Sequence, residues 1–150
     1  MQNNIAVLLP YKDQFIKDNA GSASIWVKDF SKDSKLKKNT TIFGYTSNVS
    51  KTFDNFNYVN LKFSNFGVQS KNLKYVNKFI DVLNKKKFSL IEIHNRPSYI
   101  LHIEKNLPNQ KYILVIHNNP QTLRGAVTAK ERQHLIKLCS KITFVSNWVK

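Results

Sequence analysis

The sequence predicts an α/β fold, in which helices cover both faces of a doubly wound, mostly parallel sheet of about six strands. Short apolar, β-rich runs alternate along the chain with stretches whose apolar residues recur at helical spacing. Two of these runs, residues 90–93 and 112–116, are separated by a stretch long enough for one helix. A strand, a helix and a strand in succession form a crossover unit with parallel strands, and repeated right-handed crossovers leave few other folds.

The first half of the chain contains the residues expected for three strands and two helices. Residues 5–9 predict a buried strand that ends at a proline, which lacks the N–H that a strand ladder needs. Apolar residues at helical spacing follow from Ala23 and predict a helix to about Leu36. Residues 40–45 and 57–63 predict the next two strands. A stripe of apolar side chains then predicts an amphipathic helix: Leu73, Val76, Phe79, Ile80 and Leu83.

The second half completes the Rossmann-like pattern. Residues 88–93 and 111–116 predict two strands, with a helix over residues 98–106 between them. The Thr-Ala-Lys-Glu run that begins at Thr128 has the spacing of a capping box, which starts another helix. Residues 142–145 predict a last short strand.

The length of 150 residues suits one domain with a buried core of its own. Residues 146–150 predict the first turn of a further helix, and the sequence stops there. Because domains rarely end inside an element, we expect residues 1–150 to be the N-terminal Rossmann-like domain of a longer protein. Its C-terminal domain would then be absent from this chain.

The formal net charge of +15 indicates an anionic partner, which could be a membrane surface, a nucleic acid or a phosphorylated substrate. Lysine supplies most of this charge, and lysine spread evenly over a surface can also be no more than a solvated exterior. Only three of the 24 basic residues are arginine, namely Arg96, Arg124 and Arg132. Arginine presents a planar fork of N–H donors, so we expect these positions to need that geometry.

Features that the sequence lacks indicate where in the cell the protein works. No apolar run approaches the roughly 20 residues of a membrane-spanning helix, and the N-terminus lacks the pattern of a signal peptide. Cys139 is the only cysteine, so no disulfide can form within the chain. We expect a cytoplasmic location, where the positive charge would allow peripheral contact with the inner face of the plasma membrane.

Two histidines carry the strongest functional signal. His94 and His117 each follow a predicted strand, and each is followed at once by asparagine and three residues later by proline. The carboxyl ends of neighbouring parallel strands meet at the edge where α/β sheets bind ligands. We therefore expect both imidazoles to open into a common groove, where they could bond a sugar hydroxyl or stabilise developing charge. Each histidine alone is also typical of a satisfied structural group, and no accompanying ligands predict a metal site.

Two connections are further candidates for ligand binding. The turn at Gly21 and Ser22 joins the first strand to the first helix, where a close backbone approach and free amides can hold a phosphate. A single glycine at a helix start is also a common turn residue. The connection over residues 118–129 is long and contains Arg124 beside a glycine. Long loops often bind ligands, and the alternative is a loop with a purely structural role.

Together these segments resemble the N-terminal domain of family 4 glycosyltransferases with the GT-B fold. The pattern is similar to that of the bacterial branch that builds lipopolysaccharide and other surface glycans. The resemblance is carried by residues 91–97, 116–125, 131–132 and 144–150, and the first half contributes only the turn at Gly21 and the strand order. It implies that the chain is one half of an enzyme in which two Rossmann-like domains face each other across a cleft.

The resemblance also implies roles for individual residues. His117 would lie near the transferred sugar as the catalytic residue, and Gly21 and Ser22 would lie near the donor diphosphate. The residues implied to bind the acceptor or face the cleft are His94, Asn95, Arg96, Asn118 and Arg124. Such enzymes retain the anomeric configuration, use a nucleotide-sugar as substrate and generally need no metal or other cofactor.

The sequence departs from the family in two ways. Its first turn has one glycine where many members have two, and the donor-binding C-terminal domain is absent. The implied function is therefore the acceptor-side domain of a retaining glycosyltransferase, which transfers a sugar to a glycan or lipid-linked acceptor and is inactive as this fragment.

Two hypotheses from other functional classes compete with the glycosyltransferase hypothesis. The first is a basic nucleic-acid-binding α/β module, which the charge favours, although no RNP, KH or zinc pattern is present. We therefore expect no specific nucleic-acid partner. The second is a stand-alone receiver domain, which needs an acidic cluster at the strand ends that Asp13 and Glu92 do not make.

Overall fold

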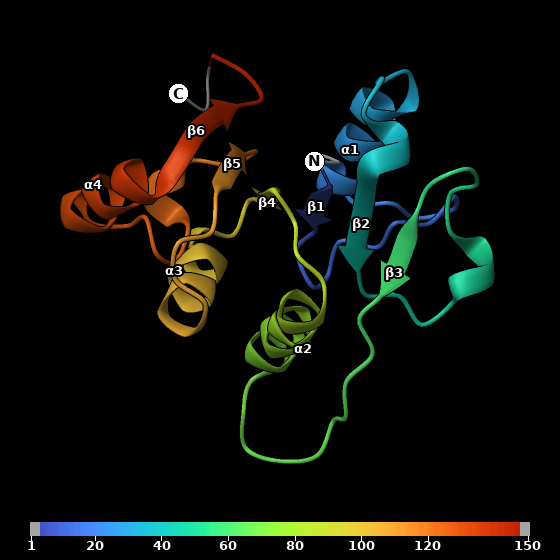
Figure 1. Cartoon of the computed structure of the whole chain (residues 1–150), viewed down its shortest axis with the longest axis horizontal. Helices are drawn as coiled ribbons and strands as arrows, with labels where there is room; N and C mark the ends of the chain where they lie inside the picture. Colours follow the sequence, from blue (N-terminus) through green and yellow to red (C-terminus); the bar gives the residue numbers. More distant parts are fainter. Residues whose placement is uncertain (1–3, 148–150) are drawn as a thin grey trace.

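The computed structural model describes residues 4–147 and confirms the predicted α/β fold (Figure 1). Six strands form one sheet in the order β3-β2-β1-β4-β5-β6, and all of its neighbouring strands are parallel. The order reverses between β1 and β4, which is the switch point at which sheets of this kind bind ligands. The strands are β1 (Ile5–Leu8), β2 (Thr40–Gly44), β3 (Tyr58–Asn60), β4 (Leu90–His94), β5 (Tyr112–Ile116) and β6 (Cys139–Phe144).

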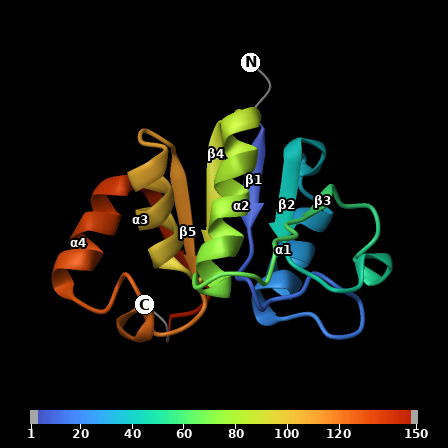
Figure 2. The ribbon, with the colours of Figure 1, turned by 90° about the horizontal axis from the view of Figure 1, so that it is seen from below.

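Helices cover both faces of the sheet, as the sequence predicts. Figure 2 shows α2, α3 and α4 on one face and α1 on the other. The helices are α1 (Ser22–Lys32), α2 (Lys71–Lys85), α3 (Pro97–Asn106) and α4 (Ala129–Leu138), with short 3-10 turns η1 (Lys37–Asn39), η2 (Val49–Lys51) and η3 (Pro120–Thr122). Among the described residues, no helix is both long and apolar enough to cross a bilayer.

The alternation of β1 divides the core between the two faces. Ala6 and Leu8 join the larger cluster beneath α2, α3 and α4, whereas Val7 and Leu9 join a smaller cluster beneath α1. Side chains that follow one another on a strand point to opposite faces, so β1 is buried on both of them. The large buried members of the first cluster include Tyr75, Phe79, Ile100, Ile103 and Tyr112.

The bounds of some helices and strands differ from those that the sequence predicts. The first helix ends at Lys32 rather than near Leu36. Beyond it the Ser34 hydroxyl accepts the N–H of Leu36, and a 3-10 turn follows. The third strand is shorter than predicted and the last one begins earlier, at Cys139. The helix predicted over residues 146–150 falls mainly outside the described residues.

The capping box predicted at Thr128 is present. The Thr128 hydroxyl accepts the N–H of Glu131 at 3.2 Å, and the Glu131 carboxylate accepts the N–H of Thr128 at 2.9 Å. These bonds lower the pKa of Glu131. They fix the start of α4 and with it the end of the long connection from β5.

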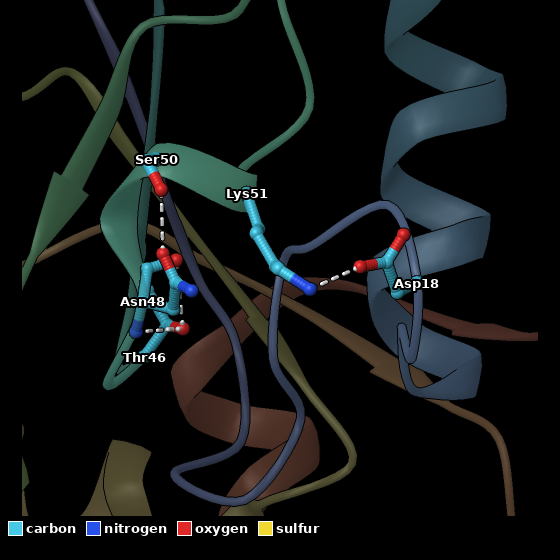
Figure 3. Close-up of polar contacts among 5 residues, drawn as sticks. All are labelled: Asp18, Thr46, Asn48, Ser50 and Lys51. Atoms are coloured by element: carbon cyan, nitrogen blue, oxygen red, sulfur yellow. Dashed lines mark hydrogen bonds and ion pairs between the residues drawn. The ribbon is translucent and has the colours of Figure 1, made fainter.

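The loop between β1 and α1 is tied to the connection between β2 and β3. Figure 3 shows the ion pair between Lys51 and Asp18, at 2.6 Å, beside the Ser50–Asn48 bond. Both ends of the ion pair are exposed, so it contributes little stability. The loop is held more firmly by the N–H of Lys17, which donates to the carbonyl of Lys51.

Candidate functional site

His94 and His117 meet at the carboxyl edge of the sheet. The Nδ1 atom of His94 lies 3.0 Å from the Nε2 atom of His117, and the ring centroids are 5.3 Å apart. His94 is the last residue of β4, opposite Val115 of the paired parallel strand β5, and His117 directly follows the end of β5. The prediction that neighbouring strand ends bring the two imidazoles together is confirmed.

The two rings differ in their access to solvent. His94 is 0% exposed, whereas His117 is partly exposed. Trp26 of α1 packs against both rings, with centroid distances of 5.2 Å to His94 and 6.1 Å to His117. The expectation that His94 lines a groove is therefore corrected, because its ring lies beneath Trp26 and His117. A ligand at this pair would meet His117.

Glu92 completes a chain of polar groups with the two histidines. Its Oε1 atom lies 2.8 Å from Nε2 of His94, and its side chain is 21% exposed. Residues two apart on a strand point to the same face, so β4 places Glu92 and His94 side by side. The signal for this contact in the sequence is the position of Glu92 two residues before His94, as a lone carboxylate in an apolar run.

The carboxylate sets the proton positions along this chain. A carboxylate oxygen only accepts, so Nε2 of His94 donates in its contact with Glu92, and Nδ1 is the nitrogen that faces His117. When the proton shared with His94 lies on Nε2 of a neutral His117, Nδ1 of His117 is unprotonated and able to accept a hydrogen bond. This assignment follows from the bonding network.

The charge state of His117 follows from its surroundings. Burial and then the charge of His94 lower the pKa of His117 to about 4, against the opposing influence of Asp13 and Glu92. Near pH 7 His117 is therefore neutral. A neutral imidazole in this tautomer can accept a hydroxyl proton in a hydrogen bond, but it is not a proton donor from Nδ1.

This low pKa predicts that His117 destabilises the fold in acid. The unfolded histidine titrates near 6.5, so as pH falls from about 7 towards 4 the unfolded state gains the proton first and stability is lost. We expect about 1–2 kcal/mol of this loss to come from His117, after a discount for its partial exposure. His117→Gln should therefore lose less stability than wild type between pH 7 and 4.5 in urea unfolding. Equal losses would contradict the assigned charge state.

The first turn holds Asp13, which sequence reasoning did not place there. The Asp13 carboxylate accepts the N–H of Ala23 at 3.0 Å and that of Ser24 at 3.1 Å, at the start of α1. A Cβ atom at Gly21 would lie 2.3 to 2.5 Å from this carboxylate, so the glycine gives Asp13 its room. A diphosphate bound near Gly21 and Ser22 would have to displace or share the helix start with Asp13.

Asn95 and Arg96 make the sharp exit from β4. Asn95 has φ of +54°, a left-handed conformation that asparagine tolerates well. Its N–H donates to the carbonyl of Val115 at 2.8 Å, and its side-chain oxygen accepts the N–H of His117 at 3.4 Å. Nη1 of Arg96 donates to the carbonyl of Asn95 at 2.9 Å. Asn95 therefore has a structural role at the strand end.

The long connection after β5 is anchored at several points. Gly125 has φ of +91°, and a Cβ there would lie 2.8 Å from the backbone nitrogen of Ser98. That nitrogen donates to the carbonyl of Arg124 at 3.1 Å. Nη1 of Arg132 donates to the carbonyls of Ala126 and Val127, at 2.9 and 2.7 Å. The fork of Arg132 therefore has a structural use, while the side chains of Arg124 and Asn118 are exposed.

Arg96 and Arg124 line one cavity of about 340 Å³ at this edge. Asn95 lines it too and links it to His117 through the hydrogen bond above. Gly21, Ser22 and Asn118 are not among its lining residues, which are Ser70, Asn72, Asn95, Arg96, Ser98, Tyr99, Thr122, Leu123 and Arg124. The structure thus brings Asn95, Arg96 and Arg124 together in one cavity, and neither His94 nor His117 lines it.

The fold and this edge define a class of protein, a Rossmann-like α/β domain with polar candidate groups at its switch point. No protein-family model matches the chain, and no curated protein matches it. Within residues 4–147, no three His, Cys, Asp or Glu side chains are grouped so that they could hold a metal ion.

Proposed function

We propose that this chain is the acceptor-side domain of a retaining glycosyltransferase, which transfers a sugar from a nucleotide-sugar to a glycan or lipid-linked acceptor. The observation that carries the proposal is the pairing of His117 with buried His94 and Glu92 at the carboxyl edge of the sheet. The resemblance of residues 91–97 and 116–125 to the family supports the same assignment. The products would be lipopolysaccharide or related surface glycans.

In this proposal His117 orients the transferred sugar. Its unprotonated Nδ1 would accept a hydrogen bond from a sugar hydroxyl, and its low pKa keeps it neutral for that role. The cavity lined by Arg96 and Arg124 would hold part of the acceptor. A second Rossmann-like domain would bind the donor and stabilise the leaving diphosphate, so residues 1–150 alone would not transfer sugar.

The net positive charge suggests where in the cell such an enzyme would work. A net charge of +15 would hold a cytoplasmic enzyme against anionic lipids on the inner face of the plasma membrane, close to a lipid-linked acceptor. Each well-placed lysine or arginine would contribute up to about 1 kcal/mol, and high salt would weaken the attachment.

The test is sugar transfer by a protein that carries both domains. His117→Ala should lower the release of nucleoside diphosphate at least about tenfold, the equivalent of one hydrogen bond of 1.4 kcal/mol. His134→Ala is the matched control, because His134 is exposed on α4 and should transfer at the wild-type rate. Thermal unfolding of each variant shows that the fold is intact. A wild-type rate for His117→Ala would remove His117 from the reaction.

A further inference from the structure

The cavity of about 340 Å³ is positively charged on its walls. It is lined by two of the three arginines in the chain, and none of its described lining residues is acidic. Arg96 reaches it from the end of β4 and Arg124 from the connection after β5. Two like charges facing one small space repel each other unless an anion lies between them. The cavity therefore has the charge of an anion site.

Hydrogen bonds fix the walls of the cavity and leave some N–H donors available to a ligand. The carbonyl of Arg124 is fixed by Ser98, while its guanidinium is exposed. Arg96 uses Nη1 on the carbonyl of Asn95, which leaves other N–H groups of its fork available. Guanidinium groups match the oxygens of a phosphate in pairs, which a lysine ammonium does not.

The remaining walls fit the polar part of such a ligand. The hydroxyl of Tyr99 donates to Oδ1 of Asn72 at 2.6 Å, so both side chains are fixed. Burial raises the pKa of Tyr99, and the charge of Arg96 opposes that shift, so the hydroxyl stays protonated near pH 7. Ser70 caps α2, whose start also faces the cavity and adds a partial positive charge. The volume lies at the lower end of the range of small-molecule sites, which is roughly 300–1,000 Å³.

We propose that Arg96 and Arg124 bind a phosphate group of the acceptor in this cavity. That the phosphate belongs to an acceptor rests on the proposed function, whereas phosphate binding itself requires only this chain. The phosphate could belong to a phosphorylated sugar or to a lipid headgroup, and the chemistry of recognition is the same for both.

The first test measures phosphate binding by the chain itself. Inorganic phosphate and glucose 6-phosphate are titrated at constant ionic strength while amide resonances are followed. Arg124→Gln and Arg96→Gln should each weaken binding at least tenfold, and Arg124→Lys should weaken it by a smaller factor because it keeps the charge without the fork. Lys137→Gln is the matched control, since it removes one charge from an exposed position on α4 and should change binding less than twofold.

The two sources of phosphate are then separated with vesicles. Phosphatidylcholine vesicles containing phosphatidic acid are compared with vesicles of phosphatidylcholine alone. Binding that depends on Arg124 supports the site in either arm, and the arm in which it appears identifies a soluble or a lipid-borne phosphate. Equal losses in Arg124→Gln and Lys137→Gln in both arms, or wild-type binding no tighter than that of chloride, would overturn the proposal.

The outcome is separable from that of the proposed function. A phosphate site that depends on Arg124, in a protein whose two-domain form transfers no sugar, would keep the site and reject the transferase. Sugar transfer that depends on His117 but is indifferent to Arg124→Gln, with no phosphate binding, would keep the transferase and reject the site.

Discussion

Gly125→Ala should destabilise the protein by about 2–5 kcal/mol. A side chain at φ of +91° is strained, which costs about 1–2 kcal/mol, and the added Cβ meets the backbone of Ser98 at 2.8 Å, where overpacking costs about 1–3 kcal/mol. The backbone at the start of α3 cannot rotate out of the way as a side chain can. Because Gly125 follows Arg124, the substitution should also move the arginine that lines the cavity.

Gly67→Ala is the matched control for this substitution. Gly67 has φ of +94°, but a Cβ there would have no atom within 4 Å. It should therefore show only the conformational strain, about 1–2 kcal/mol. Urea unfolding of the two variants measures the difference. Equal destabilisation would contradict the close docking of the connection against α3.

Glu92→Leu should destabilise the protein by about 2–3 kcal/mol. The substitution leaves the Nε2–H of completely buried His94 without its acceptor, and an unsatisfied buried donor costs about 1–3 kcal/mol, more when a charged partner is lost. It also removes the group that fixes the tautomer of His94 and, through it, that of His117. In the proposed enzyme, transfer should fall together with the loss of this constraint.

Asp81→Leu provides the control for the lost charge. Asp81 lies on α2 and pairs with Lys78 at 3.2 Å, with both side chains about half exposed. Exposed pairs of this kind contribute roughly 0.2–1 kcal/mol, so this variant should unfold close to wild type. If Glu92→Leu and Asp81→Leu lower the free energy of unfolding equally, Glu92 contributes no more to stability than an exposed ion pair does.

The fold could be predicted because its signals are local. The alternation of β-rich runs and helical stripes needs only the sequence, and the capping box at Thr128 needs only four residues. The predicted end of α1 near Leu36 was wrong, because the chain leaves the helix after Lys32 and a 3-10 turn begins at Lys37. The neighbouring positions of His94 and His117 were predictable from the rule that parallel strands end at one edge.

The parts of the site that were missed depend on contacts between distant segments. Asp13 reaches the start of α1 from ten residues away in a loop, so the chain supplies its own carboxylate at a turn that the sequence offered as one candidate phosphate site. Whether His94 is buried depends on Trp26 from another element. The use of Arg132 on two carbonyls likewise becomes visible only when the connection after β5 is folded.

The protonation of His117 near pH 7 is the measurement that bears most directly on this account of the site. The imidazole ¹⁵N resonances of the chain, recorded with long-range proton couplings, distinguish the two neutral tautomers from the charged ring. We expect His117 to be neutral at pH 7, with the proton on Nε2 and a bare Nδ1, and to gain a second proton only as the pH approaches about 4. A charged ring at pH 7, or a proton on Nδ1, would contradict the assigned network from Glu92 to His117.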